Sequence, residues 1–225
     1  MLRSLPSDGS FLASEQIKLS HTVTRIEGDR RVTGVYVAPL GADRLPDPER
    51  EEFVECDTVL FSVGLIPENE LTKKEKIQID RITKGPVVNQ YMQTSAPCVF
   101  ACGNVVHVND LVDNVSAESA LAGKFAAKYA MGTFPKAAGS VTVSPGSNVR
   151  YVCPQSILIP EDKAVTVYFR ALKPEANITL EAECCGKTVE KQKKIRVNPG
   201  EMDRLQLDLS GCSEGTVTVN IRKED

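Results

Sequence analysis

Near the start of the sequence, apolar and polar side chains alternate, as they do in strands that cover one side of a core. The alternation in Ile17–Val37 is interrupted at Gly28-Asp29 and resumes at Val32, which predicts an antiparallel hairpin. A third run, Glu52–Leu60, is expected to return beside this hairpin. The first part of the chain therefore predicts a small antiparallel sheet.

Two later runs are almost continuously apolar, which is typical of strands covered on both faces. The first, Thr58–Val63, ends at Gly64, and the second, Val99–Cys102, ends at Gly103-Asn104. A helix is expected over Val115–Met131. Buried strands followed by a helix predict an α/β segment.

Beyond this helix the pattern changes. Residues 139–147 are rich in Gly, Ser and Pro and predict a linker, after which helical periodicity is absent. Short runs separated by turn-rich pieces follow at spacings typical of a β-sandwich. These runs are Val149–Cys153, Ala164–Ala171, Asn177–Ala182, Lys187–Val197, Met202–Leu209 and Thr216–Ile221. The predicted fold class is α/β followed by an all-β, sandwich-like domain.

Composition narrows the function classes. The chain has 27 Lys and Arg against 30 Asp and Glu, which argues against nucleic-acid binding. No apolar stretch approaches the ~18 residues of a membrane span, and the expected location is cytoplasmic. The cysteine count, seven, is odd and includes no paired CxxC motif, so reduced thiols and no metal site are expected.

Candidate chemistry lies after the second apolar run. Gly103 has no side chain, so a ligand backbone can approach there. Asn104 adds an acceptor oxygen and two donors, which suit a polyhydroxyl chain or a phosphate edge. An ordinary turn has the same residues, so both interpretations stay open at this point.

The expected helix carries small residues along one face, at spacings of three and four positions. They are Ser116, Ala120, Gly123, Ala127 and Ala130. A glycine inside a helix costs about 1 kcal/mol relative to alanine, which suggests that another group approaches its backbone. Tight packing on a sheet and contact with a ligand explain this face equally well.

Three segments, in this order and spacing, resemble the pyridine nucleotide-disulfide oxidoreductase group of flavoproteins. They are Glu55–Pro67, Gln93–Asn104 and the helix containing Gly123–Ala127. The resemblance covers residues 17–132, and its details are similar to NAD(FAD)-dependent dehydrogenases with a β-rich C-terminal extension. It implies a partial two-dinucleotide-binding fold. Residues 1–57 would end an NAD(P)-binding domain, residues 58–139 would complete an FAD-binding domain, and residues 140–225 would form the sandwich-like domain.

The resemblance also implies cofactor-binding residues. Gly64 matches the segment that crosses between the two domains, and Gly103 and Asn104 match the Gly-Asp pair that holds the flavin ribityl chain. Asn114, Val115 and Ser116 match the helix start near the isoalloxazine ring.

An electron-rich flavin edge would suit the partial positive charge of this helix start, where Asp113 or Asn114 is expected to act as the cap. His107 is expected to have a loop or supporting role. A proton relay with Asp110 and Asp113 is the alternative.

Two departures limit the implied activity. Asn104 replaces the usual Asp and loses its charge, and the sequence contains neither a GxGxxG fingerprint nor the family's redox CxxxxC. We therefore expect a C-terminal fragment with a partial FAD site and most of its NAD(P) site missing. The intact enzyme would pass hydride from NAD(P)H to FAD and on to an unknown acceptor, while the fragment alone would be inactive. Catalytic residues are not identified.

Partners follow from the same departures. The expected partner is the missing N-terminal half, or a flavoprotein or electron-acceptor subunit. The alternative is a non-catalytic binding or scaffolding module that docks a partner flavoprotein subunit through the β domain.

Overall fold

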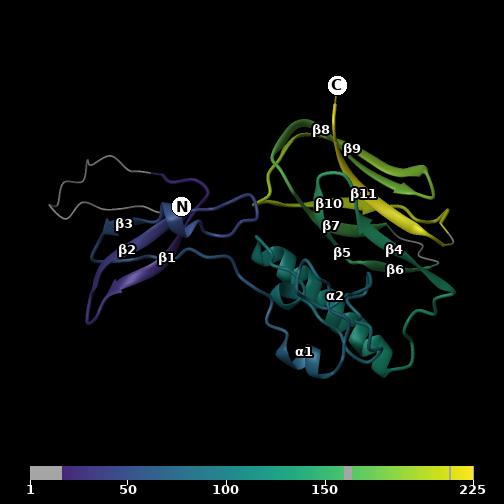
Figure 1. The fold of residues 1–225 in the computed structure, drawn as a ribbon. Coiled ribbons are helices and arrows are strands. Elements are labelled where there is room, and N and C mark those ends of the chain that lie inside the picture. The colour runs from purple at the N-terminus through teal and green to yellow at the C-terminus, as the bar shows by residue number, and fades with distance from the viewer. Residues whose placement is uncertain (1–16, 160–163, 213, 225) are drawn as a thin grey trace. The chain divides into compact units, whose positions relative to one another are not determined.

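The computed structural model describes residues 17–159, 164–212 and 214–224, and the chain divides into two compact units (Figure 1). The first unit ends at Gly64 and the second begins at Leu65. The first 16 residues of the predicted NAD(P)-domain tail lie outside the described residues. Across the described residues the fold is mixed, with mostly strands and the two α-helices α1 and α2.

The first unit contains one antiparallel sheet with the strand order β1-β2-β3. Its strands are β1 (His21–Gly28), β2 (Val32–Pro39) and β3 (Glu52–Glu55), with a short 3-10 helix, η1 (Pro48–Arg50), before β3. The predicted hairpin and its third strand are confirmed, although β3 is shorter than the predicted run.

The two fully buried strands predicted between residues 58 and 102 are not formed. Thr58–Val63 has no regular structure, and Leu60 is 87% exposed. Val99–Cys102 contributes only an isolated bridge between Gln93 and Phe100. A buried strand needs neighbouring strands for its backbone and a layer on each face. The described residues supply neither, so both strand predictions were wrong.

The second unit begins with a mostly irregular segment that carries three helices. They are α1 (Glu70–Lys74), the 3-10 helix η2 (Gly103–Val105) and α2 (Val112–Ala130). The predicted long helix is confirmed and starts three residues earlier than expected.

The predicted cap of α2 was wrong. Its N-cap residue is Leu111, which makes no side-chain cap hydrogen bond. Asp113 and Asn114 lie inside the first turn, beyond the position from which a side-chain oxygen caps the helix.

The C-terminal β-region, residues 139–223, forms two sheets with the strand orders β10-β7-β5 and β6-β4-β11-β8-β9. Its strands are β4 (Gly139–Pro145), β5 (Val149–Cys153), β6 (Ser156–Ile159), β7 (Val165–Ala171), β8 (Glu175–Cys184), β9 (Lys187–Val197), β10 (Met202–Leu207) and β11 (Thr216–Lys223). All six predicted runs form strands here. The β4–β11 pair is parallel, and the other pairs in these sheets are antiparallel.

The predicted linker at residues 139–147 is largely a strand. β4 lies inside the five-stranded sheet between β6 and β11. Val141 and Val143 are 0% and 2% exposed and belong to the core. Their alternation with polar residues was hidden by the flanking Gly, Ser and Pro, and the pairing strand β11 comes more than 70 positions later.

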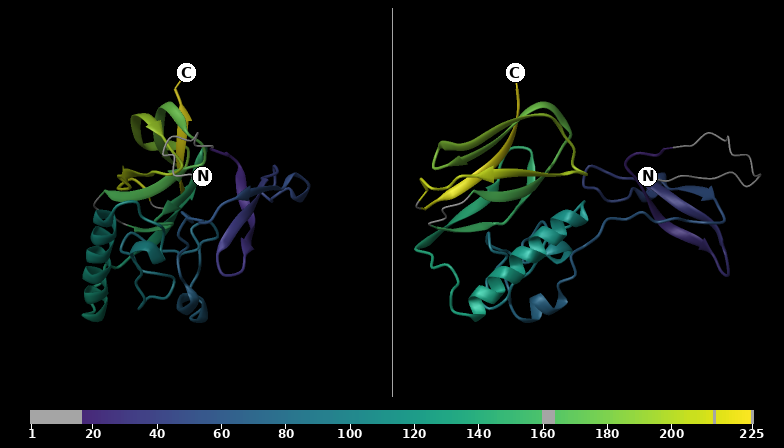
Figure 2. Two further views of the ribbon diagram at one scale, coloured as in Figure 1. Left: turned by 90° about the vertical axis from the view of Figure 1, so that its left-hand side faces the viewer. Right: turned by 180° about the vertical axis from the view of Figure 1, so that it is seen from behind.

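Side chains from both sheets share one hydrophobic core, which includes Phe169, Leu180 and Val219. Figures 1 and 2 show the helical segment against one side of these sheets. Gln90 links the helical segment to β6, because its side-chain amide donates to Leu158 O (2.7 Å) and accepts the Leu158 N–H (2.8 Å). The predicted boundary at residue 140 thus lies inside the second compact unit.

Gly85 marks a close backbone contact in this unit. A Cβ atom at Gly85 would lie 1.8 Å from Val106 O, so the backbone would have to move. We expect Gly85→Ala to lower the free energy of unfolding by about 1–3 kcal/mol in urea denaturation. Gly123→Ala is the control, because its Cβ would meet no atom within 4 Å and alanine favours a helix. Equal effects of the two substitutions would contradict this packing.

Candidate functional site

The predicted ribityl-binding turn is held by α2. Gly103 begins η2 with φ +70°, a conformation that glycine adopts without steric cost. Its buried N–H donates to Glu118 Oε2 over 2.7 Å. A Cβ at Gly103 would lie 3.1 Å from a methyl group of Val115. The turn and the start of α2 are therefore packed together.

Asn104 follows at the surface of this turn. Its side-chain oxygen accepts the backbone N–H of Asn109 over 3.0 Å. The hydrogen bond orients the amide group, so the acceptor expected to serve a ligand already serves the loop. The NH2 group leaves two donors for a ligand.

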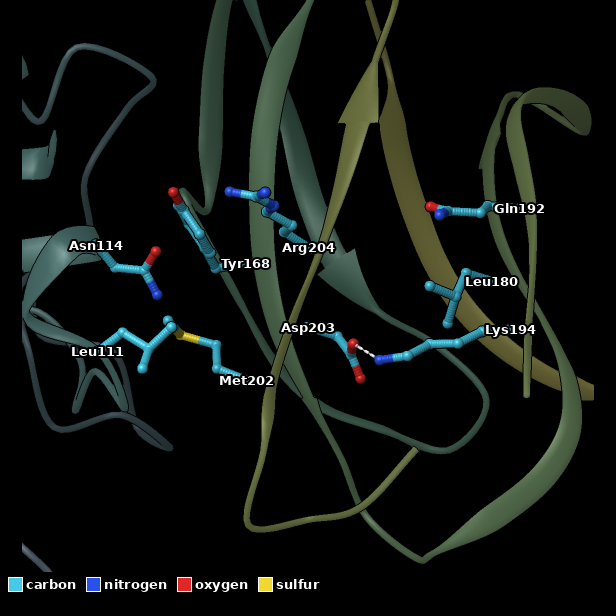
Figure 3. A pocket seen from close by; sticks show the side chains of 9 residues that line it. All are labelled: Leu111, Asn114, Tyr168, Leu180, Gln192, Lys194, Met202, Asp203 and Arg204. Atoms are coloured by element: carbon cyan, nitrogen blue, oxygen red, sulfur yellow. Dashed lines mark hydrogen bonds and ion pairs between the residues drawn. The ribbon is translucent and has the colours of Figure 1, made fainter. Parts of the chain in front are cut away.

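The start of α2 carries the other predicted residues. Asn114 and Val115 are half-buried, and Ser116 is exposed. Asn114 lines a cavity of about 370 Å³, in which its amide lies across from the Lys194–Asp203 ion pair of the β-region (Figure 3). The cavity is also lined by Leu111, Tyr168, Leu180, Gln192, Met202 and Arg204.

Gly64 is the sixth predicted residue, and it ends the first compact unit. No heavy atom lies within 4 Å of a Cβ placed there. The structure thus brings Gly103 and Asn104 together with the start of α2 in the second unit, and it describes Gly64 in the first.

A buried His–Glu pair supports the turn, and the sequence patterns do not predict it. His107 Nε2 lies 2.7 Å from Glu118 Oε1, and the two side chains are 1% and 5% exposed. Burial lowers the pKa of His107, but nearby Cys153 and Glu118 outweigh burial and raise it to about 11. Glu118 itself could have indicated a buried polar partner, because this charged residue lies on the same face of α2 as buried Ala122 and Phe125.

The small-residue face of α2 points away from the packed part of this unit. Its members, Ser116, Ala120, Gly123, Ala127 and Ala130, are all exposed. The helix instead buries Glu118, Ala122 and Phe125. Tight packing of the small-residue face on a sheet does not occur among the described residues.

The loop between the turn and α2 is also fastened to the β-region. Arg170 of β7 donates to Val108 O over 3.0 Å and forms an ion pair with Asp110. Asp110 also accepts the N–H of Met202 over 2.6 Å. The β-region therefore fixes the loop that leads into the helix start.

Other site classes find no support in the described part of the chain. It contains no cluster of three His, Cys, Asp or Glu suited to a metal ion, and no helix there is long and apolar enough to cross a membrane. The cysteines, all within the described ranges, are free thiols.

Several known proteins are similar to part of this chain. The nitric oxide reductase FlRd-NAD(+) reductase of Klebsiella pneumoniae is 36% identical over 64 residues, or 28% of this chain and 16% of that protein. An NADH oxidase of Enterococcus faecalis is 45% identical over 62 residues, or 26% and 13%. An NADH oxidase of Methanocaldococcus jannaschii is 32% identical over 104 residues, or 45% and 20%.

The matched segments thus span at most a fifth of the length of these three relatives. The sequence model of one protein family, described as pyridine nucleotide-disulphide oxidoreductase, also matches residues 15–123. Residues 15–123 are therefore similar in sequence to the pyridine nucleotide-disulphide oxidoreductase family.

Proposed function

We propose that the segment Thr94–Asn104 and the helix α2 form one wall of the FAD site of an NAD(P)H-dependent oxidoreductase. FAD would accept a hydride from NAD(P)H and pass the electrons to an acceptor that the sequence does not identify. The observation that carries this proposal is the Gly103 turn, which Glu118 holds against the start of α2 inside the matched segment.

The residues of this wall suit the sugar-like and ring portions of a flavin. Gly103 permits a close approach, and the Asn104 amide offers two donors to a ribityl hydroxyl chain. No side chain caps the start of α2, so its first N–H groups keep their partial positive charge. That end of the helix would stabilise negative charge on the pyrimidine edge of a reduced flavin.

In contrast, the sequence contains no fingerprint motif for binding the FAD and NAD(P) pyrophosphates. Their binding requires a strand, a Gly-rich turn and a helix, and the sequence contains no GxGxxG. We infer that another polypeptide segment, either an N-terminal half or a partner subunit, supplies both fingerprints. The exposed small-residue face of α2 offers it a close-packing surface.

Flavin titration tests this proposal. The purified 225-residue chain is expected to retain no FAD after gel filtration. A longer polypeptide is expected to bind one FAD per chain and to oxidise NAD(P)H if it is extended by in-frame sequence encoded upstream of Met1 that supplies the Gly-rich fingerprints. Stoichiometric, tight binding by the 225 residues alone would show that no second segment is needed.

A pair of glycine variants of the longer polypeptide locates the flavin. Gly103→Val would place a branched side chain at positive φ in the turn, and we expect it to abolish flavin retention. Gly200→Ala is the control, because its Cβ would meet no atom within 4 Å. Full flavin retention by Gly103→Val would exclude this turn as the ribityl wall.

A further inference from the structure

A cavity of about 780 Å³ lies in the second unit between α2 and the strands β5 and β7. This volume is within the range of cavities that hold small molecules. The residues that line it come from α2, from the loop at residues 90–92 and from the β-region. None of the six predicted cofactor-binding residues lines it. The flavin proposal therefore does not account for this cavity.

The inner wall of the cavity is apolar. Tyr91, Met92 and Phe125 line it and are 8%, 5% and 8% exposed. Leu121 and Val165 add aliphatic surface. The Phe125 ring already packs against Tyr91, with the ring centres 4.2 Å apart and the planes inclined by 30°. An aliphatic chain needs contact area and not a free ring face, so this wall suits a chain better than an aromatic ring.

Three lysines lie at the opening of the cavity. Lys124 and Lys136 are exposed, and Lys128 is half-buried. The Nζ atoms of Lys124 and Lys128 lie 5.6 and 5.2 Å from the centre of the Phe125 ring. Like charges four positions apart on a helix destabilise it. An anionic group bound between these two lysines would offset their repulsion.

The described part of the chain supplies no carboxylate to these lysines. None of the three forms an ion pair there. Glu118 is the one acidic residue among the described lining residues, and its oxygens bind His107 Nε2 and the Gly103 N–H over 2.7 Å each. Because His107 is paired with Glu118, unpaired positive charge in this lining lies only at the opening. The charge distribution therefore favours a ligand with a single negative end.

We infer that this cavity binds one aliphatic monocarboxylate, with its carboxylate between Lys124 and Lys128 and its chain along Tyr91, Met92 and Leu121. Burial of the chain supplies most of the affinity, and the lysines select the negative charge and fix the direction of the chain. This binding needs no flavin and does not rest on the proposed function.

Decanoate is the probe, added to the full 225-residue chain and followed by isothermal titration calorimetry. We expect one decanoate to bind per chain. Each CH2 added between hexanoate and decanoate is expected to strengthen binding by up to about fourfold. Decyltrimethylammonium has a chain of the same length and a positive charge, and it is expected to bind at least about tenfold more weakly. Affinity independent of chain length, or equal binding of the cationic probe, would overturn the inference.

Two lysine pairs separate recognition at the opening from a general effect of charge. The double variant Lys124→Ser, Lys128→Ser is expected to weaken decanoate binding by about tenfold or more. Lys73→Ser, Lys74→Ser is the matched control, because it removes the same charge from exposed positions of α1 that do not line the cavity. Circular dichroism verifies that both variants fold. Equal weakening in the two double variants would show that the lysines at the opening do not hold the carboxylate.

A further variant tests the wall assigned to the chain. Leu121 is half-buried, and Leu121→Gln makes this position polar with little change in helix propensity. It is expected to reduce the gain in affinity for each added CH2 and to keep the preference for decanoate over decyltrimethylammonium. An unchanged dependence on chain length would contradict the placement of the chain along α2.

Discussion

Replacing Glu118 with alanine is expected to lower the free energy of unfolding by about 3–5 kcal/mol, the usual result of removing one partner of a buried ion pair. The Glu118 side chain is 5% exposed, and its two oxygens bind His107 Nε2 and the Gly103 N–H. The substitution leaves an imidazolium and a backbone donor without their acceptor. Urea denaturation measures the loss.

The same substitution is expected to flatten the pH dependence of stability. The pKa of His107 is raised to about 11 in the folded chain, against about 6.5 for an unperturbed histidine. The folded state therefore holds this proton more tightly, so its stabilising contribution is complete below about pH 6.5 and disappears as the pH rises toward 11. Glu118, Cys153, Tyr151 and Tyr168 are the ionisable groups that face the imidazole.

Asp113→Ala is the matched control on the same helix. Asp113 is exposed in the first turn of α2, where its charge is worth at most about 1 kcal/mol through the helix dipole. If Glu118→Ala and Asp113→Ala destabilise the chain equally, the buried pair does not hold the turn.

The second large effect is expected for Phe169→Ala, which should also lower the free energy of unfolding by about 3–5 kcal/mol. Phe169 is 0% exposed and lies on β7, the middle strand of the three-stranded sheet. Its removal leaves a cavity between the two sheets of the β-region. Because residues 65–225 form one compact unit, the helical segment is expected to unfold in the same transition.

Leu172→Ala provides the comparison for Phe169→Ala. Leu172 follows β7 directly and is 55% exposed, so truncation removes apolar atoms without opening a cavity. Its expected effect is about 0.5 kcal/mol or less in the same urea experiment. A comparable loss from both substitutions would show that Phe169 is not a core residue.

Local patterns were sufficient where one segment decides its own structure. The β1–β2 hairpin follows from alternation and from Gly28, which has φ +129° at the end of β1. The α2 helix follows from a long stretch without proline. The Gly103-Asn104 turn and the start of α2 were found as neighbours because few residues separate them.

Local patterns failed where distant segments decide the outcome. The apolar run Thr58–Val63 was predicted to be a buried strand, but no described strand pairs with it. The Gly- and Ser-rich stretch of β4 was predicted to be a linker, but it pairs with β6 and β11. A strand requires neighbouring strands that accept and donate its backbone hydrogen bonds. The sequence of one segment does not specify which distant segments these are.

Sequence patterns were enough to predict the hairpin, the long helix, six strands of the β-region and the turn at Gly103. Each of these depends on side-chain periodicity or on backbone freedom within a few residues. Three-dimensional packing was needed to show that Glu118 accepts the Gly103 N–H and binds His107, with Cys153 near the imidazole. Proximity of this kind arises when β5 packs against the loop and α2, because spacing along the chain does not specify which buried polar groups meet.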